Sequence, residues 1–212
     1  MLQTQDRFSP SLTDWREFLE SIYRGRKLYT YGSGRSIPLQ PQDIWIVCRG
    51  LVQLSTLYPS GDEAIVGIAY ASLPFGLPFT QLSTFEATAL SEVVLMRLHL
   101  AEIEQSPSLA QGLFQQMSYR LRQTEALLAM GGYRRIEDRL RQLLVMLKQE
   151  MGQPTPEGTR IGVRLTHQQV ASLIGTTRVT VTRLLNQFRD EGVLIIDGTR
   201  HFVIPYSEVV SE

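Results

Sequence analysis

Two adjoining segments decide the fold of this chain, Leu165-Thr166-His167-Gln168-Gln169-Val170 and Gly175-Thr176-Thr177-Arg178-Val179-Thr180. Thr166 is placed to cap a helix, and Gln169 three residues later can return a hydrogen bond, which together form a capping box. Gly175 permits a sharp turn, after which Thr176 or Thr177 caps a second helix that extends to about residue 190. Two short helices joined by a glycine turn predict a helix-turn-helix.

The second of these helices has one apolar and one polar side. Its apolar side is Val181, Leu184, Leu185 and Phe188. On the other side, Arg178 and Arg183 suit bidentate contact with guanine, and the methyl groups of Val179 suit contact with thymine. The alternative is a solvated amphipathic helix with two ordinary surface arginines. We expect a helix that contacts the DNA major groove, and the residues expected at the DNA are Thr166, Gln168, Thr176, Thr177, Arg178, Val179, Thr180, Thr182, Arg183 and Arg200.

A hairpin is predicted directly after the second helix. Apolar runs at residues 193–196 and 201–204 flank Asp197-Gly198, and Asp-Gly between such runs is a strong hairpin signal. Thr199, Arg200 and His201 near its tip would suit contacts with phosphates, which position a protein without specifying sequence. His201 could equally be an ordinary exposed residue. The hairpin would complete a winged helix-turn-helix.

The preceding part of the chain changes pattern twice. An amphipathic helix is predicted over Leu12–Tyr23, and residues 27–98 hold short apolar runs separated by glycine, proline and aspartate, which indicates a small antiparallel barrel or sandwich. A long helix over residues 108–130 follows, and the glycine pair at 131–132 is expected to end it, either as a hinge or as a plain cap. Near-heptad spacing favours pairing of this helix with a second copy over packing on its own domain. The seam is expected to contain Leu113, Met117, Leu121, Thr124 and Leu128.

Composition narrows the function classes. The single cysteine, Cys48, excludes an intrachain disulfide and a multi-cysteine metal site, and no metal site is expected. Apolar runs are too short to span a membrane, and residues 1–10 lack the apolar core of a signal peptide, so we expect a cytoplasmic protein. His99, His167 and His201 lie far apart, and no phosphate-binding loop or nucleophile motif is present, so an enzyme is not expected. The net charge is zero, but residues 160–206 carry more arginines than acids.

The chain resembles the superfamily of the cyclic-AMP receptor protein and the fumarate–nitrate reduction regulator. The resemblance is most specific in the two segments quoted first, which are similar to those of the cyanobacterial nitrogen regulators. It implies an α+β fold with an antiparallel β-roll of the cyclic-nucleotide-binding type (1–107), a dimerisation helix and hinge (108–132) and a winged helix-turn-helix (133–212). It also implies a homodimer on a palindromic GTA…TAC-like site in double-stranded DNA, with RNA polymerase as a partner. A heterodimerising or protein-binding regulatory module is the alternative.

The resemblance also bears on an effector. Cyclic AMP is not expected, because no arginine lies between Arg49 and Arg97 to pair with a cyclic phosphate. In the nitrogen regulators 2-oxoglutarate is held by a Phe-Gly segment, a loop arginine, and an arginine and a glutamate of the dimer helix, and here the loop arginine has no counterpart. A degenerate or absent effector is expected, with 2-oxoglutarate or another small ligand as alternatives, and Arg120 and Glu125 could instead form an interhelical ion pair. The candidate pocket residues are Phe75, Gly76, Leu77, Arg120 and Glu125.

Overall fold

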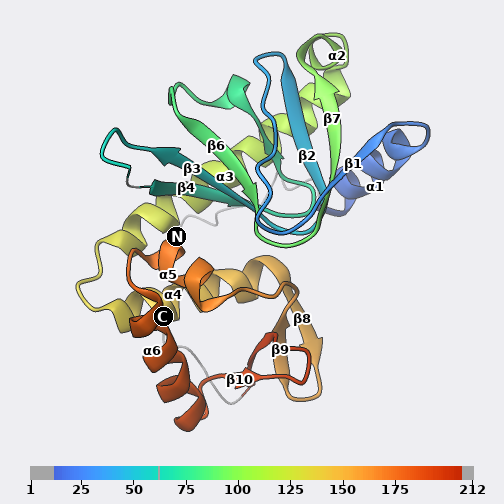
Figure 1. Cartoon of the computed structure of the whole chain (residues 1–212). Coiled ribbons are helices and arrows are strands. Elements are labelled where there is room, and N and C mark those ends of the chain that lie inside the picture. Colours follow the sequence, from blue (N-terminus) through green and yellow to red (C-terminus); the bar gives the residue numbers. More distant parts are fainter. Residues whose placement is uncertain (1–11, 62, 207–212) are drawn as a thin grey trace, which may run out of the picture.

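The N-terminal half of the structure consists of two antiparallel sheets with a shared core (Figure 1). The computed structural model describes residues 12–61 and 63–206, so the outer ends of the first and last predicted domains lie outside the described residues. One sheet has the strand order β1-β7-β2-β5 and the other β4-β3-β6, which confirms the predicted antiparallel β-roll. The strands are β1 (Leu28–Tyr31), β2 (Asp43–Arg49), β3 (Val52–Leu57), β4 (Glu63–Ala69), β5 (Pro74–Phe75), β6 (Phe85–Ala89) and β7 (Val93–His99).

The central ladder of the roll explains one glycine. Strands β2 and β7 pair with Ile44 opposite Leu98, and the register shifts between Val47 and Arg49. Gly50 follows with φ of 93°, and a Cβ there would lie 2.3 Å from the carbonyl oxygen of Glu92. The turn into β3 therefore requires a residue without a side chain, as expected for a glycine at a turn of the roll.

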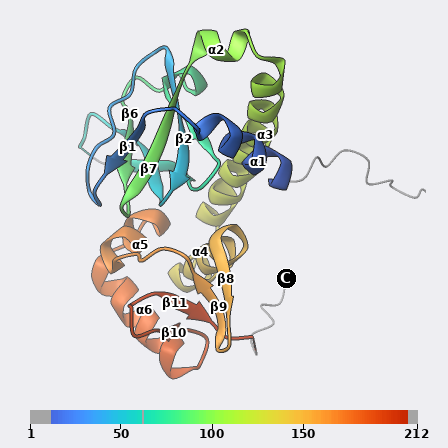
Figure 2. The same ribbon diagram turned by 90° about the vertical axis from the view of Figure 1, so that its right-hand side faces the viewer.

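Helices α1 (Leu12–Tyr23), α2 (Leu100–Glu104) and α3 (Pro107–Gly131) accompany the roll, and η1 (Leu77–Phe79) is a single 3₁₀ turn after β5. Trp15 of α1 packs over Gly112 of α3, where a Cβ would lie 2.0 Å from the indole ring. Its indole Nε1 donates to the carbonyl of Ser72 at 3.0 Å. The first half of α3 is thus fixed to α1 and to the roll, and α3 runs along one side of the β-roll (Figure 2).

Leu113 was predicted on the dimer seam, and the structure places it elsewhere. Its side chain is 5% exposed and belongs to the cluster that contains Trp15, Leu19 and Leu109. It faces the protein's own roll. The prediction failed because α3 has two apolar faces, and sequence periodicity does not distinguish them. The adjacent Phe114 is 74% exposed instead.

The C-terminal part is a winged helix domain below the roll (Figures 1 and 2). Its four strands have the order β10-β11-β9-β8. The elements are α4 (Ile136–Met151), β8 (Gly152–Thr155), β9 (Gly158–Ile161), α5 (His167–Ile174), α6 (Arg178–Asp190), β10 (Ile195–Ile196) and β11 (Phe202–Ile204).

Two local expectations from the sequence are wrong, and a third is confirmed. The glycines and prolines of residues 152–158 predict a loop, but these residues form the β8 strand and the turn into β9. The apolar periodicity after the glycine pair predicts a helix over Tyr133 to Lys148, but the helix begins at Ile136, after the cap residue Arg135. The glycine pair ends α3 as expected, since Gly131 is its last residue and Gly132 its cap, although Gly132 has φ of −73° and does not use the left-handed conformation that glycine usually provides there.

Specific hydrogen bonds connect the two domains. Gln169 Nε2 at the start of α5 donates to the carbonyl of Leu90 in the roll at 2.9 Å. The hydroxyls of Tyr70 and Tyr119 both donate to the carboxylate of Glu150 near the end of α4. Across the described residues, no helix has the length and apolar character needed to cross a membrane.

Candidate nucleic-acid interface

Helix α5 has the predicted start and end. Thr166 Oγ1 accepts from the backbone N–H of Gln169 at 3.2 Å, and Gln169 Oε1 accepts from the N–H of Thr166 at 2.7 Å, which confirms the capping box. Gly175 ends the helix with φ of 66°. Arg139 of α4 donates to the carbonyl of Ile174 at 3.3 Å and to the carbonyl of Tyr133 at 2.9 Å. One side chain thus connects the segment before α4 with the turn of the helix-turn-helix.

Helix α6 divides into the two faces expected of it. Thr177 caps it by accepting from the N–H of Thr180 at 3.2 Å. The predicted apolar residues Val181, Leu184, Leu185 and Phe188 are all buried. Arg178 and Arg183 are exposed, and Val179 is 79% exposed although it is apolar. The first two turns of α6 therefore present two guanidinium groups and one methyl-bearing side chain to solvent, which matches the donors and apolar contacts of major-groove recognition.

The threonines of α6 are more restricted than the arginines. Thr182 Oγ1 donates to the carbonyl of Arg178 at 2.9 Å and contacts His167 Nδ1 at 2.8 Å. The hydroxyls of Thr177 and Thr180 are 3.0 Å apart. Their hydroxyls thus already have partners within the protein, whereas the guanidinium groups of Arg178 and Arg183 have none among the described residues.

His167 has a place in the site that sequence reasoning did not assign. Burial and the nearby Arg178 guanidinium lower the pKa of His167, so the ring is neutral at physiological pH. A neutral ring can donate through Nδ1 to Thr182 and so links the start of α5 to the middle of α6. The spacing of fifteen residues between them gives no signal in the sequence, because the contact depends on the angle between the two helices.

The remaining predicted DNA contacts flank the two helices. Thr166 and Gln168 at the start of α5 are exposed, although the Thr166 hydroxyl is occupied by the cap. Thr176 is half-buried in the turn. Arg200 is exposed at the tip of the hairpin. The predicted residues thus fall into three groups: the start of α5, the start of α6 and the hairpin tip.

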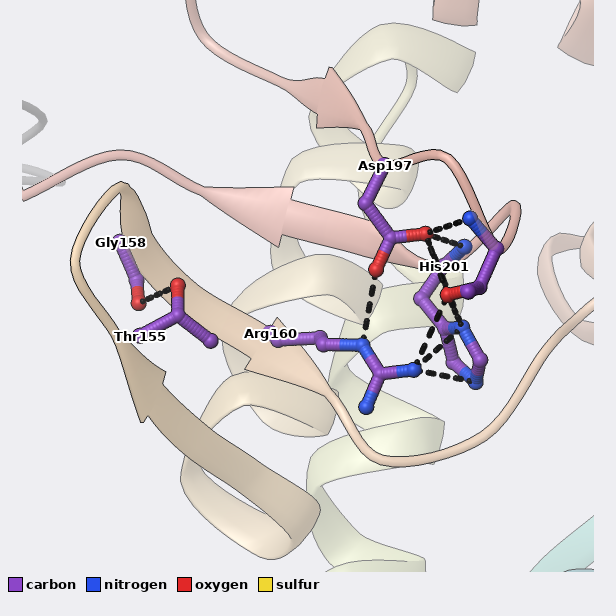
Figure 3. A network of polar contacts seen from close by, with 6 residues as sticks. Thr155, Gly158, Arg160, Asp197 and His201 are labelled. Carbon is purple, nitrogen blue, oxygen red and sulfur yellow. Dashed lines mark hydrogen bonds and ion pairs between the residues drawn. The ribbon is translucent and has the colours of Figure 1, made fainter.

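The hairpin closes through a network of polar contacts (Figure 3). Its loop comprises residues 198–200, because the N–H of Asp197 donates to the carbonyl of His201 and the N–H of Arg200 donates to that of Asp197. Arg160 of β9 donates through Nε to Asp197 at 2.8 Å, and its Nη2 lies 2.8 Å from His201 Nδ1. Thr199 and His201, considered for phosphate contact from the sequence, are therefore engaged within the wing.

Comparison with known proteins identifies this arrangement. Residues 138–208 match the Crp-like helix-turn-helix domain. The chain is 31% identical over 192 residues to the global nitrogen regulator of Synechococcus elongatus, covering 86% of this chain and 83% of that protein. It is 34% identical over 177 residues to the regulatory protein CysR of the same organism, covering 82% of each. The chain belongs to the family of Crp-like transcription regulators.

Solved structures of this family have the same fold. FixK2 from Bradyrhizobium japonicum superposes with a TM-score of 0.71 at 19% identity, covering 84% of this chain and 92% of that one. The likeness at this identity concerns the fold alone. Membership and fold together establish this Crp-like protein as a DNA-binding transcription regulator with a β-roll of the cyclic-nucleotide-binding type.

In this Crp-like regulator the outer face of α3 carries an exposed apolar stripe. Phe114, Leu121 and Leu128 are spaced by seven residues and are 74%, 61% and 80% exposed. Met117 is half-buried and Thr124 is exposed between them. A heptad of large apolar side chains exposed to solvent is typical of a helix that pairs with another helix.

Only two of the five candidate effector residues line a common pocket in the structure. Gly76 and Arg120 line a cavity of about 230 Å³ between the roll and α3. Phe75 is fully buried in the core of the roll, Leu77 lies in η1 outside this lining, and Glu125 is exposed on α3. Arg120 donates to the carbonyl of Pro74 at 3.0 Å, and burial lowers the pKa of Arg120 to about 10. The pocket therefore holds one desolvated cation and mostly apolar walls.

Proposed function

We propose that the protein acts as a homodimer that places two α6 helices in successive major grooves of a palindromic, GTA…TAC-like site. The observation that carries this proposal is the heptad stripe of Phe114, Leu121 and Leu128, which lies outside the core of the isolated chain. A symmetric pair of α3 helices would cover this stripe and relate the two reading helices by a twofold axis, as a palindrome requires. Acting as a transcription regulator in the cytoplasm, the dimer would have RNA polymerase as a partner on DNA.

A titration of fluorescent duplexes tests this proposal. Binding to a GTA…TAC palindrome should weaken steeply as salt rises, because neutralised phosphates release counterions. A duplex with only one half-site should bind more weakly, since one of the two reading helices then lacks its bases. Binding that is independent of salt, or equal on the palindrome and the half-site duplex, contradicts the proposal.

The pocket beneath α3 supports a second candidate function, regulation by 2-oxoglutarate. Arg120 is largely desolvated there, and among the described residues no carboxylate lies within ion-pair distance of it. A buried cation without a counter-ion is costly, so an anion at this place would stabilise the fold. Either a carboxylate ligand or Glu125 of a second copy could supply that anion.

The pocket nevertheless favours a degenerate or absent effector. A single guanidinium offers partners for one carboxylate of 2-oxoglutarate, and the walls around it are formed mainly by Val66, Phe79, Phe85 and Met117. We expect equal DNA-binding curves with and without 2-oxoglutarate, and with and without cyclic AMP. A leftward shift of the curve with 2-oxoglutarate that is lost in Arg120→Gln would instead establish the second function.

A further inference from the structure

We propose that Asp197 is a positioning residue for DNA binding, which fixes the wing so that Arg200 projects toward a phosphate. The inference rests on the proposed function, since it assumes that the winged domain binds duplex DNA. Asp197 lies on the hairpin beside Arg160 and His201 (Figure 3). Its carboxylate is not expected to touch DNA, because its side chain is only 19% exposed and carries the same charge sign as phosphate.

The loop of the wing holds an unusual backbone conformation. Residues 198–200 form a three-residue hairpin loop in which Arg200 has φ of 63°. Loops of this kind favour glycine at that position, since the left-handed region is unfavourable for a residue with a side chain. Gly198, which the Asp-Gly signal would place in the left-handed region, has no positive φ. An arginine therefore occupies the strained position of the loop.

Hydrogen bonds to a single carboxylate hold this conformation. Asp197 Oδ1 accepts from the N–H of Thr199 at 2.8 Å, from its hydroxyl at 2.7 Å and from the N–H of His201 at 2.9 Å. The two N–H groups lie on either side of Arg200 along the chain. Oδ2 accepts from Arg160 Nε at 2.8 Å and so anchors the loop to β9. Strained residues persist where the surroundings over-determine them, and they concentrate at functional sites.

The network also keeps its own charges away from DNA. The His201 backbone N–H and the Thr199 hydroxyl hold the pKa of Asp197 well below its usual range, so the carboxylate stays charged. Burial and the Arg160 guanidinium lower the pKa of His201, so that ring is neutral and accepts from Arg160. The remaining cation at the tip is Arg200, which is exposed and has no ion pair among the described residues.

A positioning role and simple electrostatics predict opposite changes in DNA affinity for one substitution. Asp197→Asn removes a negative charge from a DNA-binding domain, which by charge alone should strengthen binding. It also replaces the acceptor of Arg160 Nε with an amide, so positioning predicts weaker binding. Asp190→Asn is the matched control, because Asp190 is 76% exposed at the end of α6 and its substitution changes the net charge equally.

The experiment measures the dissociation constant of the full-length protein on the palindromic duplex across a series of salt concentrations. We expect Asp197→Asn to weaken binding by about 5- to 10-fold and to reduce the salt dependence, as loss of one phosphate contact in each half-site would. Arg200→Ala should give a similar loss on every sequence. In the double variant, Asp197→Asn should add less than about twofold, because the side chain that it positions is absent.

Several results would overturn the inference. Asp197→Asn binding as tightly as the wild type or more tightly, or a loss that persists undiminished in the Arg200→Ala background, excludes a role through Arg200. If Asp197→Asn lowers the melting temperature too far for binding measurements, Thr199→Val replaces it, since it removes three polar contacts of the network without changing charge. Unchanged binding by Thr199→Val also counts against the inference. Wild-type protein that shows no salt-sensitive binding would instead refute the proposed function.

Discussion

Leu128→Ala tests the dimer seam on α3 most directly. Burial of the outer carbons of one leucine side chain stabilises by about 2.4 kcal/mol at about 0.8 kcal/mol for each carbon. Leu128 is 80% exposed in the single chain, so a seam that covers it fully gains about 1.9 kcal/mol from each copy. A twofold dimer contains the residue twice, and its truncation should cost about 3.8 kcal/mol. The dimer dissociation constant should then rise by about 500-fold.

Sedimentation over a concentration series measures this change, and two further leucines serve as controls. Leu57→Ala removes the same atoms from a side chain that is 42% exposed on β3, outside α3, and should leave the dissociation constant unchanged. Leu113→Ala should lower the free energy of unfolding by about 2–5 kcal/mol, because that residue lies in the core. Equal dissociation constants for Leu128→Ala and Leu57→Ala would refute the assignment of the stripe to a dimer seam.

Three other predictions concern the helix-turn-helix and the contacts between the domains. Arg178→Ala should weaken binding to the palindrome by about 1–3 kcal/mol and relax discrimination at one base position in each half-site, measured with a panel of single-base variants; a uniform loss would indicate a phosphate contact. Arg139→Ala should lower the free energy of unfolding by about 1–3 kcal/mol, because it removes donors to two carbonyls, and Arg139→Lys should recover little since one ammonium cannot reach both. Burial raises the pKa of Glu150 to about 7, so the folded state binds that proton more tightly and urea midpoints should fall as the pH rises from 5 to 7.5. Glu150→Gln should lack this fall, whereas equal pH profiles of the two proteins would mean that the hydroxyls of Tyr70 and Tyr119 offset the effect of burial.

Signals in the local sequence made helices α5 and α6 predictable. Thr166, Gln169 and Gly175 specify a helix start and end within a few residues, and the apolar side of α6 follows from its period. These features depend on neighbours in sequence, and the structure confirms them. The strand β8 was missed because Pro154 suggests a loop, yet β8 is an edge strand, where a missing backbone donor is tolerated.

Features that depend on contacts between distant segments could not be predicted from the sequence. Arg160 meets Asp197 only because β9 pairs with β11, which places residues 37 positions apart side by side. The two apolar faces of α3 could not be separated for a similar reason. Leu113 and Phe114 are neighbours, and the packing of α3 against α1 and the roll determines which of them is covered.

The packing of Trp15 on Gly112 has a mechanical consequence. Because the ring fills the space that a side chain on the helix would occupy, the first turns of α3 cannot slide or rotate without carrying α1 along. That end of the helix behaves as a fixed support. Arg120 and Gln123 also hold the middle of α3 against the roll, through the carbonyl of Pro74 and the N–H of Ile68. Bending is therefore left to the last turns of α3 and to the segment before Ile136. A conformational change that is transmitted to the DNA-binding domain through α3 would therefore pivot about this fixed part of the helix. The displacement would be largest at the helix-turn-helix.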